Sequence, residues 1–108
     1  MVDQTVSVTS ATQSDPIRVD PTMMDISILA LLGISGTATA TVEFTPDKPD
    51  ATNGSDNWSG CTWYDIADLT GATANAWAKV DTPTHGLRID CTAYTSGTVS
   101  LQVLQGDR

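Results

Sequence analysis

Apolar residues alternate with polar ones along most of this chain, and this period of two limits the fold more than any other feature. The run from Gly86 to Tyr94 alternates throughout, with Leu87, Ile89 and Cys91 on one face. Successive side chains of a strand point to opposite faces of a sheet, so the pattern predicts a strand that is buried on one side. A chain made of such segments is typical of an antiparallel all-β fold.

The same period recurs in segments that turn residues separate. We expect strands at residues 5–9, 17–19, 24–34, 37–45, 61–66, 76–80, 86–94 and 98–104. Two hairpin turns are predicted, at Gly33–Gly36 and at Thr95–Gly97, because glycine supplies the positive φ that such turns need. The prediction is a single antiparallel β-sandwich of seven or eight short strands, of which a jelly roll is one form.

Composition supports strands over helices. The chain holds 17 Thr and 9 Ser, and 12 of its 13 acidic residues are Asp. Thr fits pleated strands, whereas helices favour residues such as Glu and Lys, which are scarce here. At 108 residues there is room for one domain. We expect a polar N-terminal arm with a short strand over 1–15, and the β-sandwich over 16–108.

Charge and hydropathy exclude several partners. The formal net charge is -8, so the basic face that nucleic-acid binding requires is missing. The longest apolar stretch, Ile28 to Ile34, is too short to cross a bilayer. The start, Met1 to Thr5, lacks the basic and apolar regions of a signal peptide. We therefore expect no nucleic-acid partner, no membrane partner, and synthesis in the cytoplasm of the producing cell.

One segment is apolar on both faces. Between Met24 and Ile34, Leu29 and Leu31 point away from the main apolar face, where a sheet that caps a small core would carry polar residues. Another layer or a partner subunit must cover them, and we favour the partner. With Val6 and Val8 of the N-terminal segment, they form our candidate subunit or capsid interface.

The longest stretch without periodicity, Pro46 to Gly60, is rich in Asp, Asn, Gly and Ser. Asp47, Asp50 and Asp56, with Trp58, are expected in an exposed loop. With Asn53 and Asn57, these three Asp residues concentrate oxygen atoms that would suit calcium. Their spacing fits neither an EF-hand nor a β-roll repeat, so a solvated acidic loop is the preferred interpretation. We expect no cofactor and no metal, and a cation or a glycan at this loop stays an alternative.

Aromatic residues raise the possibility of a platform for sugars. Trp58, Trp63, Trp77 and Tyr64 are the candidates. Because Trp63 and Tyr64 are adjacent in a predicted strand, they point in opposite directions, and one of them should be core. This leaves Trp58, in the loop, as the natural exposed ring.

No pattern predicts catalysis. His85 is the single histidine, and no G-x-S-x-G motif singles out a serine as its partner. Cys61 and Cys91 lack the spacing of a zinc site, and we favour free thiols, with Cys91 as a small core residue. We expect a protein that is not an enzyme.

Residues 82–105 read T-P-T-H-G-L-R-I-D-C-T-A-Y-T-S-G-T-V-S-L-Q-V-L-Q, and Ala38 to Thr45 are followed by a Pro/Asp loop. Both regions resemble small structural proteins of tailed bacteriophages, whose chains end in a similar hairpin segment. Trp63 lies near a tryptophan of that pattern. The similarity covers residues 37 to 105. Cys91 and the acidic insertion from Asp47 to Gly60 depart from it.

The resemblance implies a virion component without catalysis. A capsid decoration, or cement, protein fits best, binding and stabilising the assembled head at the capsid surface. The implied partners are the major capsid protein, other virion proteins and further copies of this chain, with a trimer favoured. A tail, neck or head-fibre component, or a carbohydrate-binding adhesin module, is the alternative.

Overall fold

Strands account for nearly all the regular structure of the chain. The computed structural model describes residues 2–19, 28–52, 55–80 and 83–105, with the backbone alone at residues 2, 50–52 and 55–56. The strands are β1 (Val2–Val8), β2 (Ile17–Arg18), β3 (Ile28–Thr45), β4 (Asp50–Thr52), β5 (Ser55–Asn57), β6 (Tyr64–Asp65), β7 (Ala76–Val80) and β8 (Gly86–Gln105), and a 3₁₀ turn, η1, spans Ala67–Leu69.

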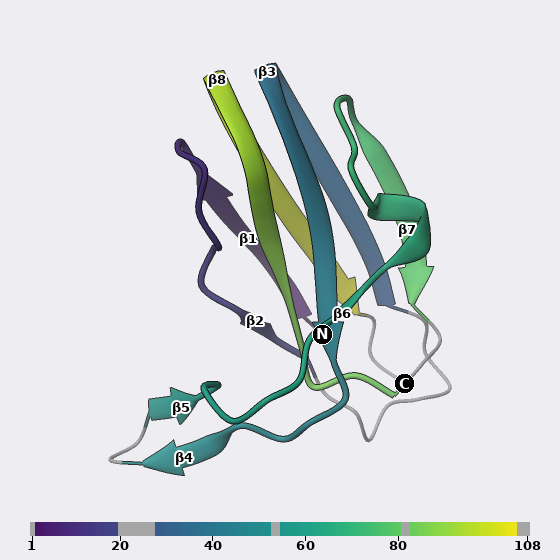
Figure 1. Cartoon of the computed structure of the whole chain (residues 1–108). Coiled ribbons are helices and arrows are strands. Elements are labelled where there is room, and N and C mark those ends of the chain that lie inside the picture. Colours follow the sequence, from purple (N-terminus) through teal and green to yellow (C-terminus); the bar gives the residue numbers. More distant parts are fainter. Residues whose placement is uncertain (1, 20–27, 53–54, 81–82, 106–108) are drawn as a thin grey trace.

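Two long strands, β3 and β8, form the centre of a six-stranded sheet (Figure 1). They run antiparallel and pair along their whole length, from Ile28 opposite Gln105 to Thr45 opposite Gly86. Along the edge of β8 that faces away from β3, β2 pairs with the start of β8 and β1 with its end. On the other side of β3, β7 and β6 do the same. The predicted all-β, antiparallel fold is confirmed.

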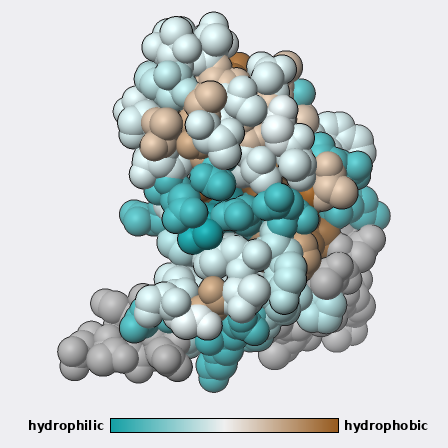
Figure 2. All heavy atoms as spheres, viewed as in Figure 1, coloured by the Kyte–Doolittle hydropathy of each residue, from teal (hydrophilic) through white to brown (hydrophobic). Residues whose placement is uncertain are grey.

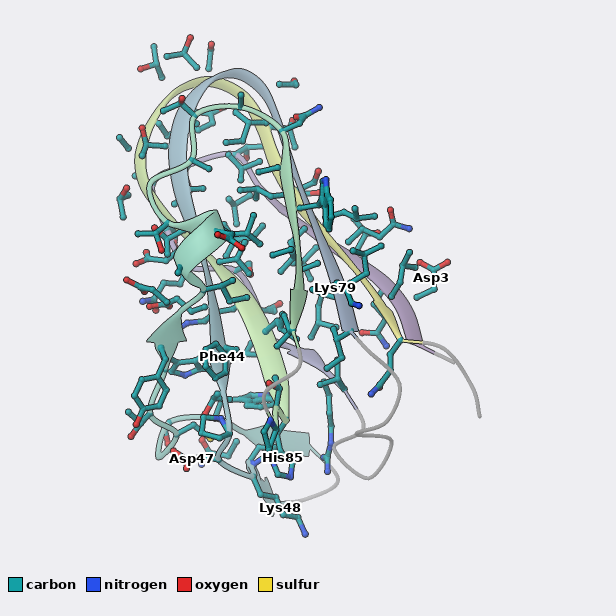
Figure 3. All side chains as sticks on the ribbon, turned by 90° about the vertical axis from the view of Figure 1, so that its right-hand side faces the viewer. Asp3, Phe44, Asp47, Lys48, Lys79 and His85 are labelled. Carbon is teal, nitrogen blue, oxygen red and sulfur yellow. The ribbon has the colours of Figure 1, made fainter. Side chains whose placement is uncertain are left out.

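Both predicted hairpin turns are wrong. Gly33–Gly36 lies inside β3 and Thr95–Gly97 lies inside β8, so neither segment reverses the chain. The two segments lie next to each other in the paired strands β3 and β8. Both strands bend over in this region (Figure 3). The sequence therefore forms two long bent strands where we expected four short ones, because each half pairs with a distant part of the chain.

Irregular register accompanies the arch. Pairing shifts between Thr37 and Ala38 and again between Thr39 and Ala40. Each shift leaves one additional residue in β8, first Thr95 and then Thr92, so β8 has 20 residues and β3 has 18. Such bulges bend and twist a strand. They also end the alternation expected from Gly86 to Tyr94, since Ala93, two residues after the buried Cys91, is exposed.

The folded sheet encloses one hydrophobic core. Both halves of β3 and β8 contribute to it, and β2, β7 and η1 close it. Its largest fully buried apolar side chains are Ile17, Val42, Leu69, Leu87, Ile89, Val99, Leu101 and Val103. The side chains predicted to face inward from residues 28–32, 86–91 and 99–103 are thus confirmed as core. Met24 and Ile26, which continue the alternation of Ile28, Ala30 and Leu32 in the sequence, lie outside the described residues.

The N-terminal segment belongs to the sheet. β1 pairs with β8 over seven residues, from Val2 opposite Gln105 to Val8 opposite Val99. Beyond β1, the amide of Ser14 donates to the carbonyl of Ile89. The segment of residues 2–14 is therefore bound to β8 of the same chain along much of its length.

The remaining segments follow the predictions in part. The strands expected at residues 17–19 and 76–80 are present as β2 and β7, and β6 covers only Tyr64–Asp65 of the expected 61–66. Within Pro46–Gly60, expected to be a loop, β4 and β5 pair as a small separate sheet. The N-G pair at residues 53–54 is typical of hairpins and could have predicted the pairing of these two strands. No helix in the described part of the chain is long and apolar enough to cross a membrane.

Candidate interaction surface

Four neighbouring strands carry an apolar surface on the side that faces away from the core. β1, the end of β8, the start of β3, and β7 lie side by side in this order. We call this surface the outer face and define it by eight residues. They are Asp3, Thr5, Leu29, Leu31, Trp77, Lys79, Gln102 and Leu104.

The register arranges the outer face in two rows across the strands. In the first row, Asp3, Leu104, Leu29 and Lys79 follow one another as cross-strand neighbours. In the second row, the order is Thr5, Gln102, Leu31 and Trp77. Directly opposed residues of an antiparallel pair share a face, so each row forms a continuous line of side chains.

Trp77 is the most prominent side chain of this surface. It is 64% exposed, and Leu29, Leu31 and Leu104 on the same face are half-buried. Its neighbours in β7, Ala78 and Val80, point into the core. Strand alternation therefore forces Trp77 and Lys79 outward.

An open groove of about 400 Å³ lies next to Trp77. Its walls include Thr5, Leu31, Asn75, Trp77 and Gln102. Asn75 is fixed because its Oδ1 accepts the amide of Ile34 at 2.8 Å. The groove thus combines one exposed indole ring with amide and hydroxyl groups.

Of the predicted interface residues, only Leu29 and Leu31 lie on the outer face. Val8 is 8% exposed and belongs to the core, and Val6 packs against that core. Both valines face inward because their partners in β8, Val99 and Leu101, do so. Val6 and Val8 are therefore removed from the candidate interface.

The side of the molecule drawn in Figure 2 carries a band of strongly hydrophilic residues across its middle. Arg88 of β8 lies opposite Glu43 of β3, and its Nε donates to Glu43 Oε1 at 2.8 Å. The guanidinium carbon lies 4.2 Å from the centre of the Trp63 ring. This cluster ties β3, β8 and the segment before β6 together.

Trp58 is not the freely exposed ring that we predicted. It is half-buried, with its ring centre 5.8 Å from that of Trp63. A side chain at Gly86 would collide with the Trp58 ring, so the ring lies directly on the backbone there. The prediction that Trp63 or Tyr64 is core is also wrong, since Trp63 is half-buried and Tyr64 is 51% exposed.

Asp47 stabilises its own loop. Its Oδ2 accepts the amide of Thr62 at 2.7 Å, and its amide donates to Thr45 Oγ1. The side chains of Asp50 and Asp56 lie outside the described residues, so the structure gives no distances between them and Asp47. Among the side chains that the structure describes, no group of three His, Cys, Asp or Glu residues could hold a metal ion.

His85 and the two cysteines, which the sequence singled out, lie at separate places in the fold. His85 lies at the same end of the molecule as Asp47 (Figure 3), and its Nδ1 is 2.9 Å from the carbonyl oxygen of Pro46. Cys91 is buried in the core and Cys61 is partly exposed, and both are free thiols, as predicted. Six of the eight residues of the outer face were not among the predicted interface residues, namely Asp3, Thr5, Trp77, Lys79, Gln102 and Leu104.

Comparison of the chain with models of protein families, with curated proteins and with solved structures found no match in any of the three.

Proposed function

We propose that this chain is a non-enzymatic structural protein of a tailed-bacteriophage particle. Within that class we propose a capsid decoration protein, which binds the assembled head at its surface after synthesis in the host cytoplasm. The resemblance that the sequence of residues 37–105 bears to small structural proteins of such phages suggests this role. A tail, neck or head-fibre position is the runner-up.

The observation that carries the proposal is the outer face with Trp77 at its edge. An exposed tryptophan beside three half-buried leucines is typical of a surface that packs against protein. A buried aromatic side chain removes about 150–250 Å² from water, worth a few kcal/mol at about 25 cal/mol per Å². Trp77 and the three leucines therefore give the outer face apolar surface that binding would bury.

A decoration protein acts by mass action. A ligand that binds the assembled lattice but not its dissociated subunits stabilises the lattice by its binding free energy. The folded sheet suits this role because β3 and β8 pair in regular register from Ile28 opposite Gln105 to Thr37 opposite Ser96, and hold the outer face as one surface. The chain needs no chemistry of its own for this function.

The copy number and position of the chain in intact particles test the proposal. We expect quantitative mass spectrometry to find it in numbers similar to those of the major capsid protein. Electron microscopy should place it over the head. Particles that lack the chain should release their DNA at a lower temperature. A handful of copies, confined to the tail or neck, would establish the runner-up and reject the decoration role.

A second candidate function, glycan binding, rests on the groove beside Trp77. An exposed indole ring provides a stacking surface, and Asn75, Gln102 and Thr5 provide amide and hydroxyl groups for hydrogen bonds. This is the adhesin alternative, moved from Trp58 to Trp77. Among the tryptophans, Trp77 alone is both highly exposed and next to a groove in the part of the chain that the structure describes.

A glycan array with three proteins tests this second function. If the chain binds a glycan there, Trp77→Ala should abolish the signal while Trp58→Ala retains it. The unfolding temperature of each variant serves as the control for folding. Absence of binding by the unsubstituted chain, or equal binding by the Trp77→Ala variant, would reject glycan binding at this groove.

A further inference from the structure

The first row of the outer face ends in opposite charges. Asp3 stands at the β1 end and Lys79 at the β7 end, with Leu104 and Leu29 between them. Both charged side chains are exposed and project from the same side of the sheet (Figure 3). Gln102 Nε2 donates to Asp3 Oδ1 at 3.0 Å, which helps to orient the carboxylate.

This order of side chains is complementary to itself. Consider a second copy placed face to face, with a two-fold axis that runs parallel to the strands between β3 and β8. The rotation reverses the row, so Asp3 of each copy lies over Lys79 of the other. The two leucines of one copy then meet the two leucines of the other at the centre. Sheets that pack face to face are about 10 Å apart, a distance that these side chains span.

Rotation about the same axis also reverses the second row of the outer face. Reversal places Trp77 of each copy over Thr5 of the other, and Thr5 lines the groove. The exposed ring of one copy thus meets the groove of its partner. Two equivalent contacts form around the central leucines, as a two-fold interface requires.

Charge distinguishes this face from the rest of the molecule. The chain carries a net charge of -8, and repulsion between copies opposes contact at most of its surface. On the described part of the outer face, the charges of Asp3 and Lys79 cancel, and the remaining side chains are neutral. A second copy can therefore approach here without the repulsion that it meets elsewhere.

We propose that the outer face binds the outer face of a second copy, giving a two-fold dimer with reciprocal Asp3–Lys79 pairs. The self-complementary order fits a second copy, and such a dimer would compete with a capsid subunit or a glycan for the outer face. A trimer, which the resemblance implies, would join two different patches head to tail instead. The inference concerns the purified chain and does not depend on a role in the virion.

Charge reversal tests the pairing. We expect the full-length chain to sediment as a dimer. Asp3→Lys and Lys79→Asp each create two like-charge contacts, so each should raise the dissociation constant of the dimer at least about tenfold. Asp15→Lys makes the same charge change as Asp3→Lys at an exposed residue away from the outer face and should leave the constant unchanged.

Restoration makes the test specific. The double variant Asp3→Lys/Lys79→Asp exchanges the two charges, so opposite charges again face each other across the interface, and it should dimerise like the unsubstituted chain. A mixture of the two single variants should form a heterodimer, since one carries two lysines and the other two aspartates at these positions. A structural defect in either variant would not be rescued by mixing.

Three results would overturn the dimer. They are a monomer at all accessible concentrations, a trimer, and single variants that dimerise as well as the unsubstituted chain. A monomer in solution that is nevertheless abundant on phage heads would reject this inference and support the decoration role. A chain that dimerises in solution but is absent from phage particles would support this inference and reject the decoration role.

Discussion

Gly36 of β3 and Gly97 of β8 lie directly opposite each other, and both have a positive φ, of 90° and 89°. A β-carbon at Gly97 would overlap the carbonyl oxygen of Ser35, and one at Gly36 would crowd the carbonyl group of Ser96. The two backbones therefore approach so closely at the arch that neither strand can carry a side chain there. This glycine pair is where the sheet turns back over its own core.

We predict that Gly97→Ala lowers the free energy of unfolding by at least about 2 kcal/mol, because strain and collision add. Gly36→Ala should behave similarly. Two other glycines serve as controls. Gly71 has a positive φ of 64° and nothing within 4 Å of an added β-carbon, so alanine there should cost about 1 kcal/mol. Gly60 has neither feature, and its alanine variant should change the stability by less than about 0.5 kcal/mol.

Urea unfolding of the four alanine variants measures these differences. The expected order of destabilisation places the two arch glycines first, Gly71 next and Gly60 last. Equal stability of the Gly97→Ala variant and the unsubstituted chain would show that the arch tolerates a side chain, contrary to this geometry.

Strand positions could be predicted from the sequence because burial on one face requires a period of two. This requirement is local, and it located β7 and the inward-facing residues of β3 and β8. The pairing partners are not local. Ile28 pairs with Gln105, and a glycine of positive φ serves a hairpin turn or a bend in a long strand equally well. Sequence spacing alone favoured the nearer partner, so the hairpins were wrong.

The candidate site was predicted in part for the same reason. Leu29 and Leu31 stand out because they are apolar at positions where polar residues are expected. Trp77 and Lys79 become members of the surface only when β7 is placed beside β3. Val6 and Val8 failed as interface residues because β1 pairs with the end of β8, a partner that lies about 90 or more residues away in the chain.

The Arg88–Glu43 pair should contribute measurably to stability. The two side chains are 18% and 13% exposed, and Arg88 also lies over the Trp63 ring. Partial burial reduces the competition from water, so a double-mutant cycle with Arg88→Ala and Glu43→Ala should give a coupling energy of about 1 kcal/mol. Lys48→Ala, which removes an exposed cation, is the control and should change stability little. A coupling energy near zero would mean that solvent screens the pair fully.

Asp47 is predicted to act as a loop cap and not as a calcium ligand. Asp47→Ala removes the acceptor of the Thr62 amide and should cost about 1–2 kcal/mol, whereas Asp47→Asn keeps an oxygen acceptor and should cost less. Asp15→Ala, at an exposed residue, is the control. Thermal unfolding with calcium and with a chelator should give the same midpoint. A midpoint that calcium raises in the unsubstituted chain, but not in Asp47→Ala, would assign a cation to this loop instead.

The two thiols should react at very different rates. Cys91 is 2% exposed within β8, and its Sγ contacts the carbonyl oxygen of Ala93 at 3.4 Å, so a thiol reagent reaches it only when the sheet opens. Cys61 is partly exposed in the segment before β6 and should react quickly. We expect one rapidly titrated thiol in the native chain and two after denaturation without reductant. A Cys61→Ser variant should retain only the slow reaction. No reactive thiol after denaturation would reveal a disulfide, and two fast thiols would mean that β8 separates readily from β3.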